Sequence, residues 1–351
     1  MSATISKSRP TIKDVAELAG VRHPSVSAVL NGAKGQHVAP ATRERILKAA
    51  EEIGYRRNGG IVAARTGKYG CAALLLSTDQ WKSNLPPEMQ NAIHDELAKA
   101  NMHLILNRLP VAALSSEREL PKILREWMCD GLLVDVTHGI PSYLVEAIER
   151  HSVPSVWLNV KRSHACVYPD DFGAGERAGN LLLSAGCQSL VYVGMQLAQG
   201  QISHHYSVDD RADGVRRSAQ SAGARYSRVD QLVWASFEDR KRPVVELISR
   251  LERPAGFVTY SPKQAELVLR AAEESGLRVP EDLALVTFAN LPSEIFQYEL
   301  TCFLVPDAEV GKQAADMLMR KVADPDRRET AMPINFGFFA GNTCPASAGT
   351  T

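Results

Sequence analysis

The stretch Thr11–Leu30 reads TIKDVAELAGVRHPSVSAVL and predicts two short helices joined by a tight turn. Thr11 and Asp14 have the spacing of a capping box, in which each side chain satisfies a backbone N–H at a helix start. Apolar residues follow at helical spacing, and Gly20 supplies the left-handed turn that ends a helix. Pro24 suits the first turn of a second helix, because the N–H that proline lacks has no partner there. This pattern is typical of a helix-turn-helix, whose second helix enters the major groove of DNA.

The second helix is predicted to have two different faces. Val26, Val29 and Leu30 form an apolar face that can pack on the rest of the unit. The opposite face carries small and polar side chains, namely His23, Ser25, Ser27, Ala28 and Asn31. We expect this second face to contact the edges of bases.

A third helix is expected over 40–53, with an apolar face at Ile46, Ala49, Ala50 and Ile53. Its polar side carries Arg43, Arg45 and Lys48, which can either reach phosphates or remain solvated.

Residues 58–68, NGGIVAARTGK, are expected to form a linker. Gly59 and Gly60 each oppose helix formation by about 1 kcal/mol relative to alanine. We therefore expect a flexible tether in the unbound chain. One or two helical turns would form there if a partner chain and a DNA groove held them.

Charge is distributed unevenly over a chain whose formal net charge is zero. Residues 1–70 contain twelve Lys and Arg against five Asp and Glu, a net charge of +7, so residues 71–351 carry −7. A basic head on an acidic body indicates that the head meets a polyanion. The alternative is an ordinary solvated charged surface.

The six cysteines show no C-x-x-C spacing, and several lie in apolar runs. We expect buried free thiols in a reducing compartment, with the protein in the cytoplasm. The N-terminus does not resemble a signal peptide, and the apolar runs are too short to cross a bilayer, so no membrane partner is expected.

From Cys71 onward, apolar runs of buried-strand type alternate with helical patterns. The predicted strands are CAALLL, HLILN, GLLVDV and SVWLN, followed after about residue 165 by LVYVG, GFVTY and LALVTF. Helices are expected at about 88–100, 116–128, 142–151, 172–185, 211–221, 237–252, 262–275 and 306–322, and INFGFF is expected to be one late strand. This pattern predicts a doubly wound parallel α/β body with two lobes, in which ligands bind beyond the carboxyl ends of the strands.

Several stretches resemble the lactose-repressor (LacI) family of bacterial transcription regulators. They are TIKDVAELAGV…SVSAVLNG…ATRERILKAAEEIGYRRN, DRADGVRRSAQSAG, ESGLRVPEDLALVTF and ELTCFLVPDAEVGKQAADML. The resemblance implies an α/β fold class, with an N-terminal three-helix helix-turn-helix head and a two-lobed body of periplasmic-binding-protein-like, doubly wound parallel sheets. It also implies a DNA-binding domain at 1–57, a hinge at 58–69 and an effector-binding and dimerisation domain at 70–351.

The resemblance further implies a homodimer on a near-palindromic double-stranded DNA operator. The DNA contacts would come from Thr11, His23, Pro24, Ser25, Ser27, Ala28, Asn31, Thr42, Arg43, Tyr55, Asn58 and Ala64. Ala28 stands where the family often has a base-reading arginine, so discrimination of about 1–3 kcal/mol is lost at that point. We expect His23 and Ser27 to carry the remaining contacts, with more weight on DNA shape.

The hinge also departs from the family pattern. Arg57 replaces a proline, and Ala64 falls where a leucine usually inserts between base pairs. Alanine is a poor wedge. Either the operator is kinked less, or a one-residue shift makes Ile61 or Val62 the wedge.

The resemblance places an effector between the lobes. Candidate contacts are Asp170, Asp171, Arg211, Trp234, Ser261, Ala289 and Asn290. Ser261-Pro262 and Ala289-Asn290 depart from positions where the family carries amides and carboxylates, so we expect a ligand other than an ordinary sugar, or none. Trp234 can stack on a ligand ring or belong to the core.

Other chemistry is not supported by the spacing of residues. Asp171-Phe172-Gly173 lacks the other kinase motifs, and we expect Asp170 and Asp171 to cap a helix. His204-His205 lacks the further ligands of a metal site, so neither a metal nor a cofactor is expected. The sequence predicts a DNA-binding regulator, not an enzyme. One alternative is a regulator whose body is a ligand-free interaction platform, and a remote alternative is a sugar-transport protein.

Overall fold

The computed structural model describes residues 9–31, 38–79, 82–110, 118, 122–126, 128–137, 139–196, 205–232 and 235–345. The chain divides into two compact units, Met1–Tyr69 and Gly70–Thr351, which we call the head and the body. Each unit is described by itself below.

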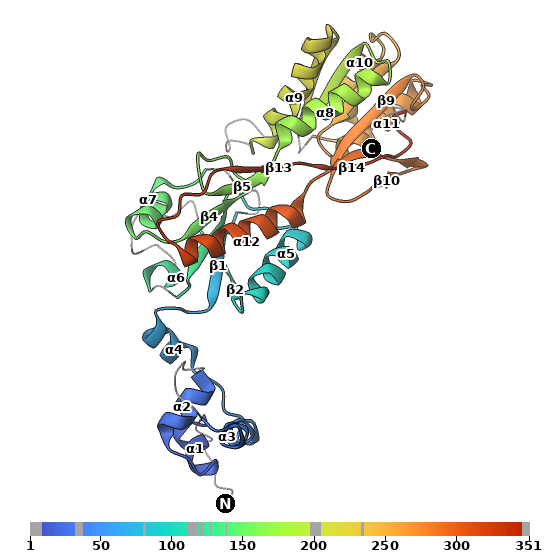
Figure 1. Ribbon diagram of the computed structural model, residues 1–351. Coiled ribbons are helices and arrows are strands. Elements are labelled where there is room, and N and C mark those ends of the chain that lie inside the picture. The colour runs from blue at the N-terminus through green and yellow to red at the C-terminus, as the bar shows by residue number, and fades with distance from the viewer. Residues whose placement is uncertain are drawn as a thin grey trace, which may run out of the picture. The chain divides into compact units, whose positions relative to one another are not determined.

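The head contains four helices (Figure 1). They are α1 (Ile12–Leu18), α2 (His23–Asn31), α3 (Pro40–Glu52) and α4 (Gly59–Thr66). The first three pack around a small core that includes Val15, Val26, Ile46 and Ala49. The predicted capping box is confirmed, because Thr11 Oγ1 accepts from Asp14 N–H and Asp14 Oδ2 accepts from Thr11 N–H at 2.6 Å. Gly20 adopts the expected left-handed conformation, with φ of +62°.

The body has two six-stranded sheets, each of which forms one lobe. In the first lobe the strand order is β13-β5-β4-β3-β1-β2, and all pairs are parallel. Its strands are β1 (Cys71–Ser77), β2 (His103–Leu109), β3 (Gly131–Asp135), β4 (Ser155–Leu158), β5 (Cys166–Pro169) and β13 (Met332–Ile334). The helices are α5 (Pro87–Lys99), α6 (Lys122–Arg125), α7 (Ser142–Arg150) and α12 (Asp307–Ala323).

The second lobe has the strand order β14-β12-β9-β8-β6-β7, in which only the β12–β14 pair is antiparallel. Its strands are β6 (Ser189–Gln196), β7 (Arg225–Leu232), β8 (Ala255–Thr259), β9 (Leu283–Ala289), β12 (Thr301–Leu304) and β14 (Gly337–Phe339). The helices are α8 (Asp171–Ser184), α9 (Ser207–Ala222), α10 (Phe237–Ile248) and α11 (Pro262–Glu274). A small hairpin, β10 (Glu294–Ile295) and β11 (Tyr298–Glu299), follows β9.

Helices cover both faces of each sheet, as a doubly wound fold requires (Figure 1). In the first lobe, α5 and α12 pack on one face, and α6 and α7 pack on the other. In the second lobe, α8 and α9 cover one face, and α10 and α11 cover the other. The six cysteines are free and buried, as predicted. No helix among the described residues combines the length and the apolar character needed to span a membrane.

Three predictions of secondary structure were wrong. INFGFF is not one strand, because the chain leaves the first sheet after Ile334 and joins the second at Gly337. The helix expected at 116–128 is observed only over Lys122–Arg125, and residues 111–117, 119–121 and 127 lie outside the described part. Residues 59–66 form α4 rather than the expected tether.

Two local hydrogen bonds lie at the ends of α4. Asn58 Oδ1 accepts from Gly60 N–H at 3.0 Å, which caps the start of the helix. Thr66 Oγ1 donates to the Val62 carbonyl at 2.8 Å near its end. Composition alone overestimated the effect of the two glycines, because it did not include these bonds.

Candidate nucleic-acid interface and ligand site

Helix α2 is anchored in the head by Val26 and Val29, whose exposed fractions are 0% and 6%. His23 and Pro24 are exposed at its amino-terminal end, and Ser25 and Ser27 are half-buried. The prediction that Ala28 lies on the outer face was wrong, because only 7% of this residue is exposed. The first turn of α2 therefore presents the side chains that can reach a ligand. The Asn31 side chain lies outside what the structure describes.

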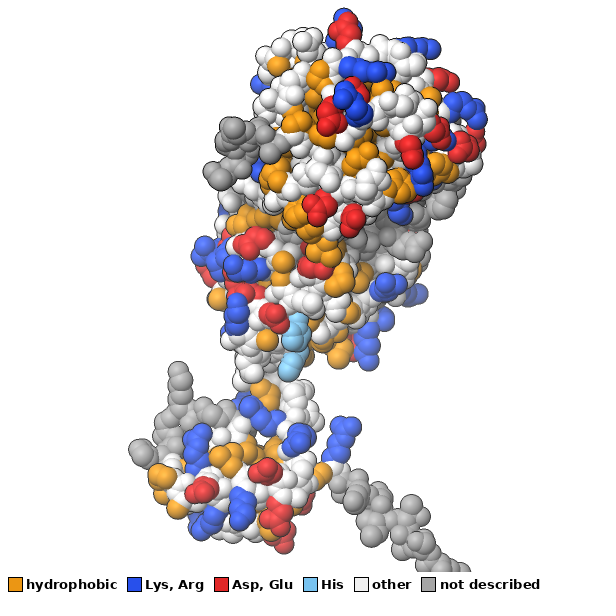
Figure 2. All heavy atoms as spheres, turned by 90° about the vertical axis from the view of Figure 1, so that its right-hand side faces the viewer, with side chains coloured by type: hydrophobic (Ala, Val, Ile, Leu, Met, Phe, Trp, Pro, Cys, Tyr) orange, Lys and Arg blue, Asp and Glu red, His pale blue; other side chains and the backbone are white. Residues whose placement is uncertain are grey.

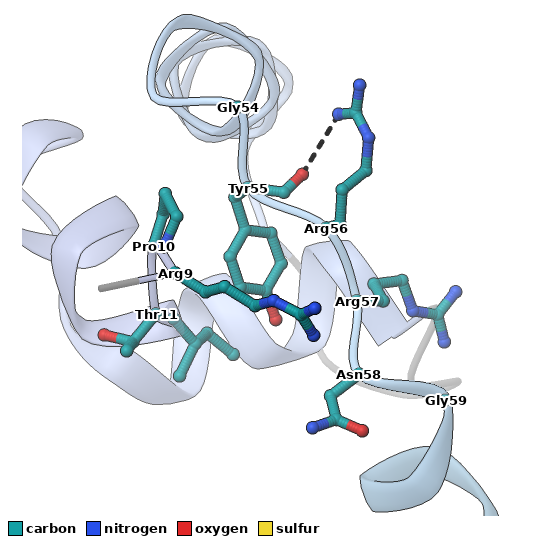
Figure 3. A pocket seen from close by; sticks show the side chains of 10 residues that line it. Arg9, Pro10, Thr11, Gly54, Tyr55, Arg56, Arg57, Asn58 and Gly59 are labelled. Atoms are coloured by element: carbon teal, nitrogen blue, oxygen red, sulfur yellow. Dashed lines mark hydrogen bonds between the residues drawn. The ribbon is translucent and has the colours of Figure 1, made fainter. Parts of the chain in front are cut away.

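A second group of predicted contacts surrounds a hollow of about 620 Å³ in the head (Figure 3). Thr11, Tyr55 and Asn58 line it, together with three arginines that the sequence analysis did not select. These are Arg9, Arg56 and Arg57. Arg9 extends beside the Tyr55 ring, while Arg56 Nη1 donates to the Tyr55 carbonyl at 3.2 Å and points away from that ring (Figure 3).

The arginines at this hollow have no acidic partner among the described residues. The same holds for every described Lys and Arg of the head, over residues 9–31 and 38–69. Figure 2 shows these side chains spread over the visible face of the head, with fewer acidic ones between them. Arg43 on α3 is exposed, and its neighbour Thr42 is half-buried. Cations without a protein counter-charge are available to phosphates.

Helix α4 presents little apolar surface in its carboxyl-terminal half. Ala64 is exposed, whereas the adjacent Ala63 is buried, with 5% of its surface exposed. Val62 is half-buried, and the Ile61 side chain lies outside the described part of the chain. A less kinked operator, and a shift that makes Ile61 or Val62 the wedge, both stay predictions.

In the body, Arg211 and Asp171 form a buried ion pair. Arg211 Nε donates to Asp171 Oδ1 at 2.6 Å, and the two side chains are 8% and 1% exposed. Close packing of α8 on α9 sets this geometry, because a Cβ on Gly175 would lie 2.3 Å from the Arg211 carbonyl oxygen. Asp170 caps α8, as predicted, by accepting from Gly173 N–H at 3.1 Å.

Three aromatic rings surround the Arg211 guanidinium. The centroids of Tyr260, Phe288 and Phe336 lie 4.7, 4.5 and 5.5 Å from its Cζ atom. Arg211 Nη1 also donates to the Tyr260 carbonyl at 2.9 Å. These rings come from the carboxyl ends of β8 and β9 and from the crossing between β13 and β14. The Arg211 guanidinium is therefore a buried charged group inside a wall of aromatic rings.

The remaining predicted ligand contacts are distributed around this wall. Ser261 Oγ donates to Gln264 Oε1 at 2.5 Å at the start of α11, and Ala289 is buried at the end of β9. Asn290 donates to Asp307, the first residue of α12. Burial raises the pKa of Asp307 to about 6, although the Asn290 hydrogen bond opposes this rise. Trp234 lies outside the described residues.

The sequence analysis missed two buried acids near the carboxyl ends of strands. Asp307 is one, and Asp135 at the end of β3 is the other. Asp135 is fully buried, its Oδ2 accepts from Asn84 N–H at 3.1 Å, and its Oδ1 has no partner in the described part of the chain. Burial raises the pKa of Asp135 well above its ordinary value. The usable signal was a lone carboxylate that ends an otherwise apolar strand, GLLVD.

The two lobes also touch through the start of α9, which begins at Ser207 rather than near residue 211. His205 Nε2 donates to the Asn159 carbonyl at 2.9 Å, and Tyr206 Oη donates to the Pro169 carbonyl at 3.3 Å. Lys161 of the first lobe pairs with Asp210 of the second. The described residues contain no cluster of three His, Cys, Asp or Glu side chains that could hold a metal ion, and His204 lies outside them.

Comparisons with known proteins agree with both halves of this description. Residues 11–58 match the model for "Bacterial regulatory proteins, lacI family", and residues 180–335 match a "Periplasmic binding protein-like domain". The chain is 26% identical over 343 residues to the HTH-type transcriptional regulator GntR of Pseudomonas aeruginosa, covering 96% of each chain. It is 25% identical to the HTH-type transcriptional repressor PurR of Vibrio atlanticus, covering 93% of this chain and 96% of that one.

Solved structures show the same fold. A lac repressor dimer bound to operator and the anti-inducer ONPF matches 97% of this chain and 100% of its own, with a TM-score of 0.73 at 18% identity. A complex of the transcriptional regulator CelR with cellobiose matches 95% of this chain and 100% of its own, with a TM-score of 0.59 at 21% identity.

A helix-turn-helix head joined to a two-lobed ligand-binding fold defines a DNA-binding transcription regulator. Its head carries a LacI-family DNA-binding domain, and its body carries a periplasmic-binding-protein-like domain. Its relatives are transcription regulators rather than enzymes.

Proposed function

We propose that two copies of this chain bind a near-palindromic operator, most simply as a repressor in the cytoplasm, and that a small molecule between the lobes changes the affinity for DNA. The observation that carries the proposal is that the described residues of the head give its cations no acidic partner, while the first turn of α2 is exposed. Each head would place the first turn of α2 in a major groove. The two half-sites would be separated by about one helical turn or a multiple of it.

The DNA contacts divide into two kinds. His23, Pro24, Ser25 and Ser27 are placed to meet base edges, whereas the residues around the head hollow are placed to meet phosphates. Because Pro24 lacks a side-chain donor and Ala28 is buried, direct readout rests on few side chains. The operator would then be selected in large part through its shape and deformability.

The ligand site would use the wall around Arg211, together with Asp307 at the start of α12 and Asp135 at the end of β3. A relative aligns with this chain over nearly its whole length, body included, and one structural neighbour holds cellobiose. Both observations support a ligand-binding body over a ligand-free platform. A ligand that prefers one arrangement of the lobes shifts the population of DNA-competent dimers by linkage.

Selection of bound sequences from a random DNA pool tests this function. The expected product is a palindrome with a fixed half-site spacing. Fluorescence anisotropy should then be measured with the selected duplex and with a scrambled one. His23→Ala should weaken binding to the two duplexes by unequal amounts, whereas Arg57→Gln should weaken binding to both. The control Arg242→Gln changes an exposed cation of α10 in the body and should leave both affinities unchanged. Failure to enrich any sequence would contradict specific binding.

A further inference from the structure

The ammonium group of Lys161 is held between elements of the two lobes. Lys161 follows β4 of the first lobe, and its Nζ atom pairs with the Asp210 carboxylate on α9 of the second. The same Nζ atom lies 5.2 Å from the ring centroid of Tyr206 and 5.8 Å from that of Tyr168. The two rings meet edge to face, at 6.0 Å and 85°.

A carboxylate combined with aromatic faces is the arrangement that proteins use to bind ammonium groups. The negative faces of the rings add to the attraction of the carboxylate, and their hydrocarbon surface removes water from the cation. Asp210 is itself partly withdrawn from water, since only 22% of its side chain is exposed. A cation at this position therefore compensates the Asp210 carboxylate for the contacts with water that it has lost.

The other cations nearby already have partners. Arg211 is paired with Asp171, and Arg228 is paired with Asp209 and Asp230. Lys161 alone supplies the charge that faces Asp210 in the described part of this junction. If Lys161 moved away, Asp210 and the two tyrosines would form a site ready for another cation.

Lys161 can be displaced. Its side chain is 38% exposed, so water reaches it without any rearrangement of the core. An ion pair this accessible gives little net stability, and holding a long flexible side chain in one position costs conformational entropy. A small rigid amine would lose less entropy on binding at the same place.

We propose that this is an ammonium site, which Lys161 occupies in the free protein and which an amine-bearing small molecule occupies in its place. The inference rests on the proposed ligand site between the lobes and names the chemical class of that ligand: a primary amine, such as an amino sugar or a diamine. Because Lys161 and Asp210 belong to different lobes, exchange replaces a direct tie between the lobes with a tie through the ligand. Ligand binding is thereby coupled to the arrangement of the lobes.

Chemical rescue tests the site itself. In the full chain carrying Lys161→Ala, n-propylammonium restores the missing atoms and should raise the melting temperature in a saturable manner. The neutral analogue n-propanol should not. Lys161→Met retains most of the side-chain stem, so n-propylammonium should not raise the melting temperature of this variant. The rise should also be lost in the double variant that combines Lys161→Ala with Asp210→Asn. Equal stabilisation by propanol, or rescue that survives Asp210→Asn, would overturn the proposal.

Matched ligand pairs test the class of ligand. Glucosamine against glucose, and putrescine against 1,4-butanediol, differ mainly in an amine against a hydroxyl group. The amines should stabilise the wild-type chain and bind at least about tenfold more weakly to Asp210→Asn. Stabilisation by glucose but by neither amine would refute the proposed class. In that case operator binding by the head would still be measurable by anisotropy, so the proposed function is tested separately.

Discussion

The head and the body of this regulator treat their cations in opposite ways. The described Lys and Arg side chains of the head form no ion pair, whereas cations of the body such as Arg211, Arg228 and Arg320 contact carboxylates. The body pairs many of its cations internally and in places buries them. The head leaves its charges for a partner that brings its own negative charge. The same residue types therefore serve folding in one unit and recognition in the other.

Breaking the Arg211–Asp171 pair should give the largest effect on stability. Asp171→Ala leaves a buried guanidinium without its counter-ion, which costs about 3–5 kcal/mol. Urea unfolding of the full chain, followed by tryptophan fluorescence, measures this change. The exposed pair Arg242–Asp239 is the control, because Arg242→Ala should cost less than about 1 kcal/mol. Equal costs for the two variants would remove the distinction between buried and exposed charges in the body.

The head depends on a core of few residues, so a single cavity should unfold it. Ile46→Ala removes a fully buried side chain of α3, at a cost of about 3 kcal/mol. DNA binding measured by anisotropy should be lost, while the body keeps its unfolding midpoint. Leu47→Ala changes the next residue, which is 48% exposed, and should cost no more than about 0.5 kcal/mol. Retained binding by Ile46→Ala would show that the head has stability beyond this core.

The acid Asp307 should make the body less stable as the pH rises. Burial raises its pKa from 3.8 to about 6 in the folded state, so the folded chain binds more protons than the unfolded chain between these values. Stability should fall by no more than about 2 kcal/mol from pH 4 to pH 6.5 because of this group. Asp307→Asn should flatten the dependence in that window. An unchanged profile in the variant would assign the pH dependence to other groups.

A smaller effect is expected at the start of α1. Thr11→Ala removes the side-chain half of the capping box and should cost the head about 1 kcal/mol. The hydrogen bonds from Thr11 hold the pKa of Asp14 below its ordinary value. The contribution of Asp14 is therefore present above pH 3.8 and is lost as the pH falls through the lowered value. Thr11→Ser should restore stability in thermal unfolding, and a Ser variant as unstable as Ala would refute the capping role.

Local patterns in the sequence were sufficient for much of this fold. The capping box, the turn at Gly20 and the strands of the body depend on residues that are close together in the chain. The burial of several cysteines also followed from the apolar runs around them. The family resemblance then placed Asp171 and Arg211 at one site, and the structure pairs them.

The features that sequence reasoning missed depend on contacts between distant residues or on the detail of a cap. The division of INFGFF follows from the separation of the two sheets, and α4 begins with a cap from the Asn58 side chain. Lys161 and Asp210 are 49 residues apart, and no local pattern in the sequence pairs them. Ala28 was misplaced because a methyl group fits either face of a helix.

The salt dependence of operator binding tests most directly the claim that the head reserves its cations for phosphates. The account predicts a linear fall of log K with log salt concentration for the wild-type chain, with a slope of several units. Arg57→Gln should make that slope shallower by about one unit, and the body variant Arg242→Gln should not change it. A flat plot, or an equal change of slope in both variants, would contradict the account.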